Sequence, residues 1–479
     1  MSAIPSEGEP LTPRAIARMA EIDVETASDD DVVALMAAWA RVKTYAEGQI
    51  ARAVLTLRER VPPGEAFDAD ELVSAEVAAA LHLGTGGADR LVATAAVLAS
   101  RFPATLEAVR AGAVSWAKAT TLVERTAVLD DAAARLVEER VLPAAAGRTP
   151  AQHADAVRRA VDRVDTASAD ERRRRALADI ELIRQHVGDG MGELFARMTS
   201  EQLDTVWLGA DAWARRQKAA GDGRTLGQLR VAALVQWAQD FLVTAAPRRH
   251  GRAVRLTVLW DLTSVLGLTD HCGELADSGA TLPPSAVREL LAGGAGLRRM
   301  LIDPDTGELV DLSSRRVALP PVDPGQSTQP VDLNIVVTTD QLRSMRSGED
   351  AAVSSALELA PPDLREMLLA PITADDLDSA PASYPARSAL AEFVGMRDRH
   401  PTNPGAGLCA ARAGDIDHVV SVRNGGRTVR DNLHSPTRRW HRLRTHGGWT
   451  VVRTGRGWRW TSWTGRSVTT GPYDYRLGP

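Results

Sequence analysis

Apolar residues recur at three- and four-residue spacings through much of the first third of the chain. The stretch that begins at Asp29 has acidic residues in its first turn and apolar residues on one face, which predicts an amphipathic helix. The same spacing predicts further helices at about 72–82, 87–101, 103–111, 115–129 and 131–145. Thr149 and Pro150 are typical of the N-cap and first position of another helix. The short connections favour packed antiparallel helices.

The period of the pattern changes near residue 179. Apolar and polar residues alternate over 179–198 on both sides of a Gly-Asp-Gly sequence, which predicts a β-hairpin. Two long amphipathic helices are predicted next, at about 200–220 and 226–242, and the composition of 252–260 is that of a strand.

These patterns divide the chain into four regions. Residues 1–28 lack periodicity and are predicted to form a flexible leader, whereas 29–315 form a mainly helical domain with a β-hairpin and a few strands. Residues 316–384 are rich in Pro, Asp and Ser, which favours an irregular insertion or linker with helical stretches inside it. Residues 385–479 then form a basic domain that ends in a small hairpin.

Composition narrows the class of protein. With 44% hydrophobic and 25% charged residues, the chain of 479 residues is globular rather than disordered or fibrous. Its two cysteines, Cys272 and Cys409, exclude a disulfide scaffold and a CxxC-type zinc site. No apolar run approaches the roughly 20 residues needed to cross a bilayer, and the polar N-terminus is unlike a secretory signal. We therefore expect a cytoplasmic protein without membrane contact, and the bias toward Arg and Ala suggests an actinobacterial source.

The net charge of −5 conceals a strong asymmetry. Residues 394–479 contain 15 arginines, no lysine and five acidic residues, a net charge of +10, whereas residues 1–393 have 42 basic and 57 acidic residues, a net charge of −15. A basic module on an acidic body indicates a partner that is a polyanion, although a solvated basic face is the simpler alternative. Half of the ten histidines also lie in this tail, which favours a site there.

Residues 32–312 resemble an actinobacterial domain of unknown function, DUF222. Four segments carry the resemblance: 101–126, 140–165, 187–198 and 301–312, the last of which is LIDPDTGELVDL. The resemblance implies a lineage rather than a chemistry, because the helical part of the family has no established activity. It also implies that an HNH nuclease module follows at the C-terminus.

The basic tail has the residues that such a module requires. Asp417 and His418 end an alternating segment, Asn432 follows fourteen residues after His418, and His441 lies nine residues further on a predicted helix. A Gly-Gly turn separates the first pair from Asn432. This order and spacing resemble the HNH, or ββα-metal, nuclease finger.

The resemblance implies a role for each of these residues. Asp417 and His441 would hold one Mg²⁺, Mn²⁺ or similar divalent ion per active site, and His418 would be the general base. Asn432 would orient His418 or help to bind the ion. A phosphodiester requires this combination, because its charge must be neutralised and a nucleophile made from water. An imidazole with a pKa near 6.5 can accept that proton at neutral pH.

Simpler interpretations exist for the same residues. Asp417 can cap a turn, Asn432 can be an ordinary turn residue before a helix, and His441 can lie on a helix surface. The remaining histidines of the tail, His400, His434 and His446, are interpreted as surface residues, and Asp415 as a residue that supports the metal ligands.

Four arginines share the predicted helix with His441 and are candidates for contact with DNA phosphates: Arg438, Arg439, Arg442 and Arg444. Contacts of this kind make binding dependent on salt and largely indifferent to base sequence. Trp458 and Trp460 fall on one face of the predicted terminal hairpin, which favours packing on the finger rather than stacking on bases.

The chain departs from its presumed relatives at the structural zinc site. The positions at which these relatives carry zinc ligands hold Pro401, Ala406, Thr437 and Trp440, and Cys409 is out of register. None of the four can bind zinc, so no structural zinc is expected and Trp440 is predicted to fill the space by packing. The alternative is a degenerate finger that binds DNA but does not cleave it.

Taken together, the sequence predicts a mainly α N-terminal region joined to a small α+β finger of the ββα-metal type. The expected function is metal-dependent hydrolysis of DNA phosphodiester bonds by an HNH endonuclease. The alternative is a catalytically inactive nucleic-acid-binding protein. RNA as a substrate and the oligomeric state are left open by the sequence.

Overall fold

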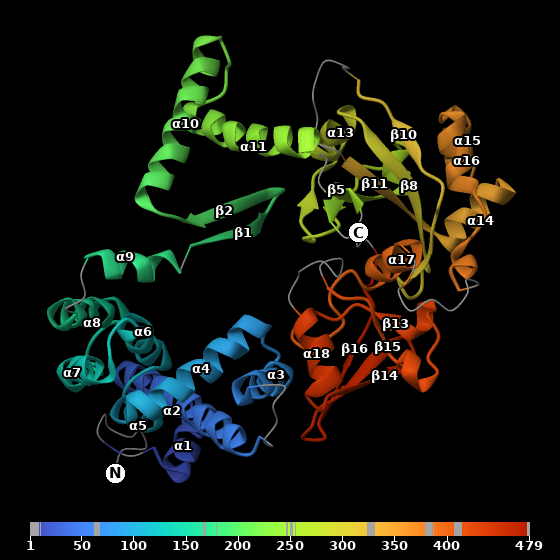
Figure 1. Ribbon diagram of the computed structural model, residues 1–479. Helices are drawn as coiled ribbons and strands as arrows, with labels where there is room; N and C mark the ends of the chain where they lie inside the picture. Colours follow the sequence, from blue (N-terminus) through green and yellow to red (C-terminus); the bar gives the residue numbers. More distant parts are fainter. Residues whose placement is uncertain are drawn as a thin grey trace. The chain divides into compact units, whose positions relative to one another are not determined.

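The computed structural model describes residues 9, 11–61, 68–165, 169–178, 180–245, 248–249, 252–253, 255–322, 331–378, 386, 388–406 and 414–476. The chain divides into two compact units, Met1–Ala176 and Leu177–Pro479. Figure 1 draws the first in blue to cyan-green and the second in green to red.

The first unit is helical. Its helices are α1 (Pro13–Ala20), α2 (Asp29–Glu59), α3 (Ala69–Leu81), α4 (Thr85–Arg101), α5 (Pro103–Arg110), α6 (Trp116–Thr126), α7 (Asp131–Val141), α8 (Pro150–Val164) and α9 (Ala169–Leu177), the last of which crosses into the second unit. The apolar faces of α2 to α8 form one core that includes Val92, Leu98 and Leu122. The predicted helical N-terminal region is therefore confirmed.

Side chains that cap the backbone mark the starts of these helices. The Ser28 side chain accepts a hydrogen bond from the Asp31 N–H at the start of α2, and Thr149 forms a capping box with Gln152 around Pro150 at the start of α8. These contacts satisfy backbone donors that a helix leaves unpaired in its first turn.

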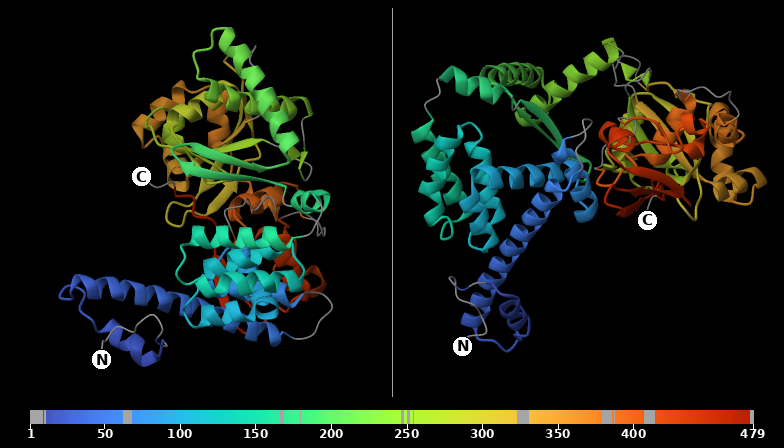
Figure 2. Two further views of the ribbon diagram at one scale, coloured as in Figure 1. Left: turned by 90° about the vertical axis from the view of Figure 1, so that its left-hand side faces the viewer. Right: turned by 60° about the horizontal axis from the view of Figure 1, so that its bottom comes forward.

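The prediction of a flexible leader over residues 1–28 is wrong at residues 13–20, which form the helix α1. Thr12 caps this helix and Pro13 occupies its first position. Met19 packs against Leu35 and Ala38 of α2, and Figure 2 shows α1 beside the end of the long α2 helix. A helix of only eight residues offers too few repeats for its period to be recognised in the sequence.

The second unit begins with the predicted hairpin, β1 (Glu181–Gly188) and β2 (Met191–Arg197). Asp189 and Gly190 both have positive φ angles, of 50° and 70°, as a tight two-residue turn between antiparallel strands requires. The two predicted long helices follow as α10 (Ser200–Ala219) and α11 (Leu226–Ala245).

A mixed sheet of seven strands forms the centre of the second unit. Its strands are β5 (Leu256–Asp261), β6 (Gly273–Leu275), β7 (Thr281–Leu282), β8 (Ala295–Ile302), β9 (Leu309–Leu312), β10 (Val317–Leu319) and β11 (Val331–Thr338). β11 lies between β5 and β8 and is parallel to both, whereas the other pairs are antiparallel. A separate short pair is formed by β3 (Arg248–Arg249) and β4 (Arg252–Ala253). The helices α12 (Leu262–Val265) and α13 (Pro284–Ala292) lie between strands in the chain.

The interval 316–384 is not the irregular insertion that its composition predicts. It contains β10 and β11 and the helices α14 (Thr339–Ser347), α15 (Ala351–Leu359) and α16 (Pro362–Leu369). β11 is almost wholly buried. A segment as short as β11 is difficult to assign to a strand or a helix by periodicity alone. It also follows a segment rich in Pro, Asp and Gly, which indicates a loop.

The last part of the chain contains small antiparallel sheets. Its elements are α17 (Ser388–Asp398), β12 (Asp417–His418), β13 (Leu433–His434), α18 (Arg438–His446), β14 (Thr450–Thr454), β15 (Gly457–Thr461) and β16 (Ser467–Thr470). β12 pairs with β13, and β14, β15 and β16 form a second sheet, one strand larger than the predicted hairpin.

In contrast to the prediction, this part is not a separate domain. It belongs to the same compact unit as the mixed sheet, and Arg399 forms an ion pair with a residue of that sheet. The buried Arg399 guanidinium donates hydrogen bonds to both carboxylate oxygens of Glu274, at 2.7 and 3.1 Å. Tyr475 is fully buried in a core shared with Met300 of β8, and its hydroxyl donates to the carbonyl of Met396. Residues 385–476 and the sheet therefore belong to one compact unit.

No single helix in the described ranges is long and apolar enough to cross a membrane, although α4 and α5, bent at their junction, meet the length and composition requirements as a pair.

Candidate functional site

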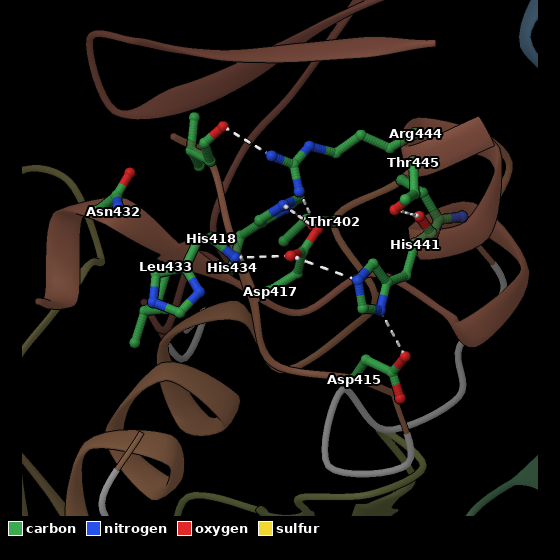
Figure 3. Close-up of polar contacts among 12 residues, drawn as sticks. Thr402, Asp415, Asp417, His418, Asn432, Leu433, His434, His441, Arg444 and Thr445 are labelled. Atoms are coloured by element: carbon green, nitrogen blue, oxygen red, sulfur yellow. Dashed lines mark hydrogen bonds and ion pairs between the residues drawn. The ribbon is translucent and has the colours of Figure 1, made fainter. Parts of the chain in front are cut away.

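The predicted site residues come from three places in the C-terminal part. β12 carries Asp417 and His418, the loop before β13 carries Asn432, and α18 carries His441. Strand pairing sets Asp417 opposite His434 and His418 opposite Leu433. Figure 3 shows that Asp417 and His441 point toward one another across the space between β12 and α18.

The imidazole of His441 lies between two carboxylates. Its Nδ1 is 2.7 Å from Oδ2 of Asp415, and its Nε2 is 3.5 Å from Oδ1 of Asp417. Because an ionised carboxylate can only accept, Nδ1 is the protonated nitrogen in the bond to Asp415. The lone pair of a neutral His441 ring is then on Nε2, facing Asp417. A carboxylate behind the ring is the usual partner of a metal-ligating histidine.

Asp417 is a buried carboxylate with a strong positive neighbour. Burial alone would raise its pKa, but the nearby His434 ring and the charge of Arg444 outweigh burial and lower the pKa of Asp417 to about 2. Arg444 Nη1 lies 2.5 Å from Asp417 Oδ2, and its Nη2 donates to the Val419 carbonyl at 3.0 Å. Asp417 is therefore ionised at neutral pH and already paired with a cation.

His434 is not the surface residue that the sequence predicts. Its side chain is completely buried, Nδ1 bonds Thr402 Oγ1 at 2.8 Å, and Nε2 lies 3.8 Å from Asp417 Oδ2. That last contact is too long for a hydrogen bond, so its effect on Asp417 is electrostatic. Burial lowers the pKa of His434.

His418 is adjacent to Asp417 but makes different contacts. Its Nε2 lies 2.9 Å from Thr428 Oγ1, and its backbone N–H donates to the Asp417 carboxylate at 2.8 Å. Partial burial lowers the pKa of His418, and this effect exceeds the opposite influence of Asp417. The neutral imidazole is consequently its main form at neutral pH.

Asn432 fixes the loop rather than His418 itself. Its side-chain oxygen accepts from the Val420 N–H at 2.8 Å, and its amide nitrogen donates to the carbonyls of Val420 and Arg427, at 2.9 and 2.8 Å. Three hydrogen bonds hold the two ends of the 420–427 loop together. Asn432 therefore acts on His418 through the backbone two residues away.

The four arginines of α18 differ in their contacts and in their exposure to solvent. Arg444 faces Asp417, and Arg438 Nη1 pairs with Asp415 Oδ2 at 2.7 Å. Arg442 is exposed and Arg439 is half-buried. The helix thus presents positive charge to solvent and also directs it into the site.

Trp440, also on α18, is 1% exposed. Its ring packs edge-on against Trp449, with centroids 4.7 Å apart, and against Trp460 at 5.4 Å. Trp458 and Trp460 are fully buried, as the packing interpretation of the terminal strands predicts. Of the residues related to a structural zinc site, Cys409 lies outside the described residues.

A model of the family described as "Domain of unknown function (DUF222)" matches residues 32–321. The chain belongs to the DUF222 family. A comparison with curated proteins and one with solved structures each gave no match. The DUF222 region ends before the candidate site, so the site is interpreted from its own geometry.

The donor set suits an ion that needs few protein ligands. Within the described residues, no group of three or more His, Cys, Asp and Glu side chains is arranged to hold a metal ion. Two ligands of one Mg²⁺, each about 2.1 Å from it, are at most about 4.2 Å apart. The 3.5 Å between His441 Nε2 and Asp417 Oδ1 lies within this limit, and Mg²⁺ commonly keeps several waters.

The sequence does not reveal several contacts of this site. It indicates Asp415 as a supporting residue, but the hydrogen-bonded pair Thr428 and His418 is separated by ten residues and carries no motif. Thr402, which holds His434, lies 32 residues from it. Such pairs depend on how the loops close, which local patterns do not encode.

Proposed function

We propose that this DUF222 protein is a metal-dependent HNH endonuclease that hydrolyses DNA phosphodiester bonds. The observation that carries the proposal is the line of three groups Asp415, His441 and Asp417. His441 is oriented from behind by one carboxylate and faces the other. Two electron-pair donors facing one another at this distance favour a cation between them.

The order of elements supports the same proposal. An antiparallel pair, β12 and β13, precedes the helix α18, with Asp417 and His418 on the first strand and His441 on the helix. We interpret this arrangement as a ββα-metal finger, with the second strand and the loop between the strands supporting the site.

Asp417 and His441 would hold one Mg²⁺, Mn²⁺ or similar ion. When bound, that ion would neutralise charge on the phosphodiester and on the departing oxygen. Asp415 would keep the His441 ring in the tautomer that leaves Nε2 as a ligand. Arg444, which pairs with Asp417, would have to move its guanidinium from the carboxylate, and a phosphate oxygen is a suitable new partner.

His418 would act as the general base. Thr428 contacts the ring at Nε2 and helps to orient it, and the neutral imidazole would take up the proton from the attacking water. Asn432 would be a positioning residue, because it closes the loop that begins directly after His418. Neither residue requires contact with DNA for these roles.

The exposed charge of α18 would bind the phosphate backbone. Arg439 and Arg442 lie on the same helix as Arg438 and Arg444 and would take part in this binding, and each phosphate that is neutralised adds to the salt dependence of binding. DNA is the proposed partner, and RNA is a second substrate to be compared in the same assay.

A catalytically inactive DNA-binding protein is the second candidate. It is favoured by the ion pair between Arg444 and Asp417, which occupies the carboxylate, and by the Pro, Ala, Thr and Trp at the four zinc-ligand positions.

Incubation of the full chain with supercoiled plasmid separates the two candidates. The endonuclease converts the plasmid to nicked or linear forms with Mg²⁺ or Mn²⁺ and not with excess EDTA. The inactive protein retards the plasmid on a gel in both conditions and leaves it supercoiled.

A further inference from the structure

Helices α10 and α11 leave a large apolar surface uncovered. On α11 the exposed residues Val231, Leu234, Val235 and Phe241 recur at helical spacing and therefore form one stripe. The large apolar residues of the two helices that are 36–67% exposed are Leu203, Val206, Trp207, Leu208, Val231, Leu234, Val235, Trp237, Phe241 and Val243.

The contact between the two helices does not cover this surface. Their buried positions are mostly small, and include Ala210, Ala214 and Ala233. An ion pair between Asp211 and Arg230 at 2.5 Å supplements the contact. The large side chains of both helices consequently remain partly exposed to solvent, although the Trp207 ring is covered on one side by the Arg230 guanidinium.

The uncovered apolar residues are numerous enough to take part in a protein interface. Ten large apolar side chains on two neighbouring helices are at least 36% exposed, and an interface of standard size buries about 800 Å² on each partner. Monomers rarely leave an apolar patch of more than about 600 Å² in water. The β1–β2 hairpin that leads into α10 is also exposed along its whole length.

The charges of α10 indicate what covers the surface. The helix begins with Glu201 and Asp204 and ends with Arg215, Arg216 and Lys218. When two such helices pair in antiparallel fashion, with the centre of the pairing level with Ala210, the acidic end of each lies beside the basic end of the other. Asp204 and Arg216 are equally far from Ala210 along the helix, so Asp204 of one copy lies level with Arg216 of the other.

We propose that this surface binds a second copy of the same chain, with the two α10 helices antiparallel and the α11 stripes buried between the copies. Such an interface is isologous, because each copy offers the same patch and the same two charged ends. The chain is then a homodimer, and its DNA-binding parts act in pairs.

The mass of the full chain in solution tests this proposal. Light scattering after size exclusion should give twice the chain mass of 51.3 kDa. Phe241→Glu should weaken the dimer roughly 100-fold or more, since aromatic side chains that become buried in an interface are often hot spots and this one occurs twice. Leu359→Glu is the matched control, because Leu359 is 89% exposed on α15, and it should leave the dimer unchanged.

Charge reversal tests the orientation. Asp204→Arg and Arg216→Asp should each weaken the dimer, and the chain with both substitutions should regain it. Circular dichroism confirms that each variant is folded, as expected for exposed positions. A single-copy mass at micromolar concentration overturns the proposal, and so does a dimer that Phe241→Glu does not weaken. Failure of the double variant to recover overturns the antiparallel arrangement.

Discussion

Asp415 Oδ2 lies 2.7 Å from Nδ1 of His441, on the side of the ring away from Asp417. This contact decides which nitrogen of His441 faces the neighbouring carboxylate. A ring that lost it would be free to rotate or to change tautomer, and its Nε2 would no longer be held toward Asp417.

Replacement of Asp415 by alanine should therefore weaken binding of Mn²⁺ by about 10–100-fold, the usual loss when a metal-ligating histidine loses its carboxylate partner. Titration calorimetry with the full chain measures the affinity. Asp431→Ala is the control, because the Asp431 side chain is 88% exposed and lies outside the site. Unchanged affinity in Asp415→Ala would mean that His441 is not oriented by this contact.

Arg444 should compete with the ion for Asp417. The pair is shielded from solvent, with side chains 16% and 9% exposed, so its attraction is only weakly screened. We expect Arg444→Gln to bind Mn²⁺ roughly fivefold more tightly in the absence of DNA, a gain of about 1 kcal/mol. Arg442→Gln, an exposed change on the same helix, should leave the affinity unaltered. Weaker binding in Arg444→Gln would contradict competition.

Trp440 should stabilise the C-terminal part by packing. Trp440→Ala removes a buried indole and should lower the free energy of unfolding by about 3–5 kcal/mol, whereas Trp440→Phe should cost less. Urea denaturation followed by tryptophan fluorescence reports the difference.

Chelation should leave the fold intact, because no zinc is expected at the four positions. One tightly held zinc per chain, with unfolding on its removal, would refute this account.

A fragment that begins at residue 385 should not fold as an independent domain. In this fragment Arg399 would lose its ion pair with Glu274, and Tyr475 would lose the apolar neighbours from the sheet that bury it, such as Met300. A fragment of residues 177–479 retains both contacts and should give dispersed NMR spectra and cooperative unfolding. Cooperative unfolding of the shorter fragment with equal stability would show that the contacts with the sheet are dispensable.

Local chemistry explains why the helices between residues 29 and 164 are predictable from the sequence. Their starts carry caps such as Ser28 and Thr149, and their faces repeat over several turns. β11 offers neither signal, because it is only eight residues long and its partners β5 and β8 are distant in sequence.

The same distinction applies to the site. The spacing in the sequence identifies Asp417, His418 and His441 as candidate site residues, and the structure places Asp417 beside His441. The burial of His434 and the pairing of Arg444 with Asp417 arise from tertiary packing. Asn432 is recognised by position, but its three hydrogen bonds to the loop backbone appear only in the folded chain.

Cleavage by the His418→Ala protein is the most direct test of the proposed nuclease. A general base contributes to the transition state and little to binding of the ground state. We predict that the variant loses metal-dependent plasmid nicking while its affinity for DNA in a gel-shift assay stays unchanged. His446→Ala, an exposed histidine at the end of α18, should nick at the wild-type rate. Undiminished nicking by His418→Ala would contradict the account.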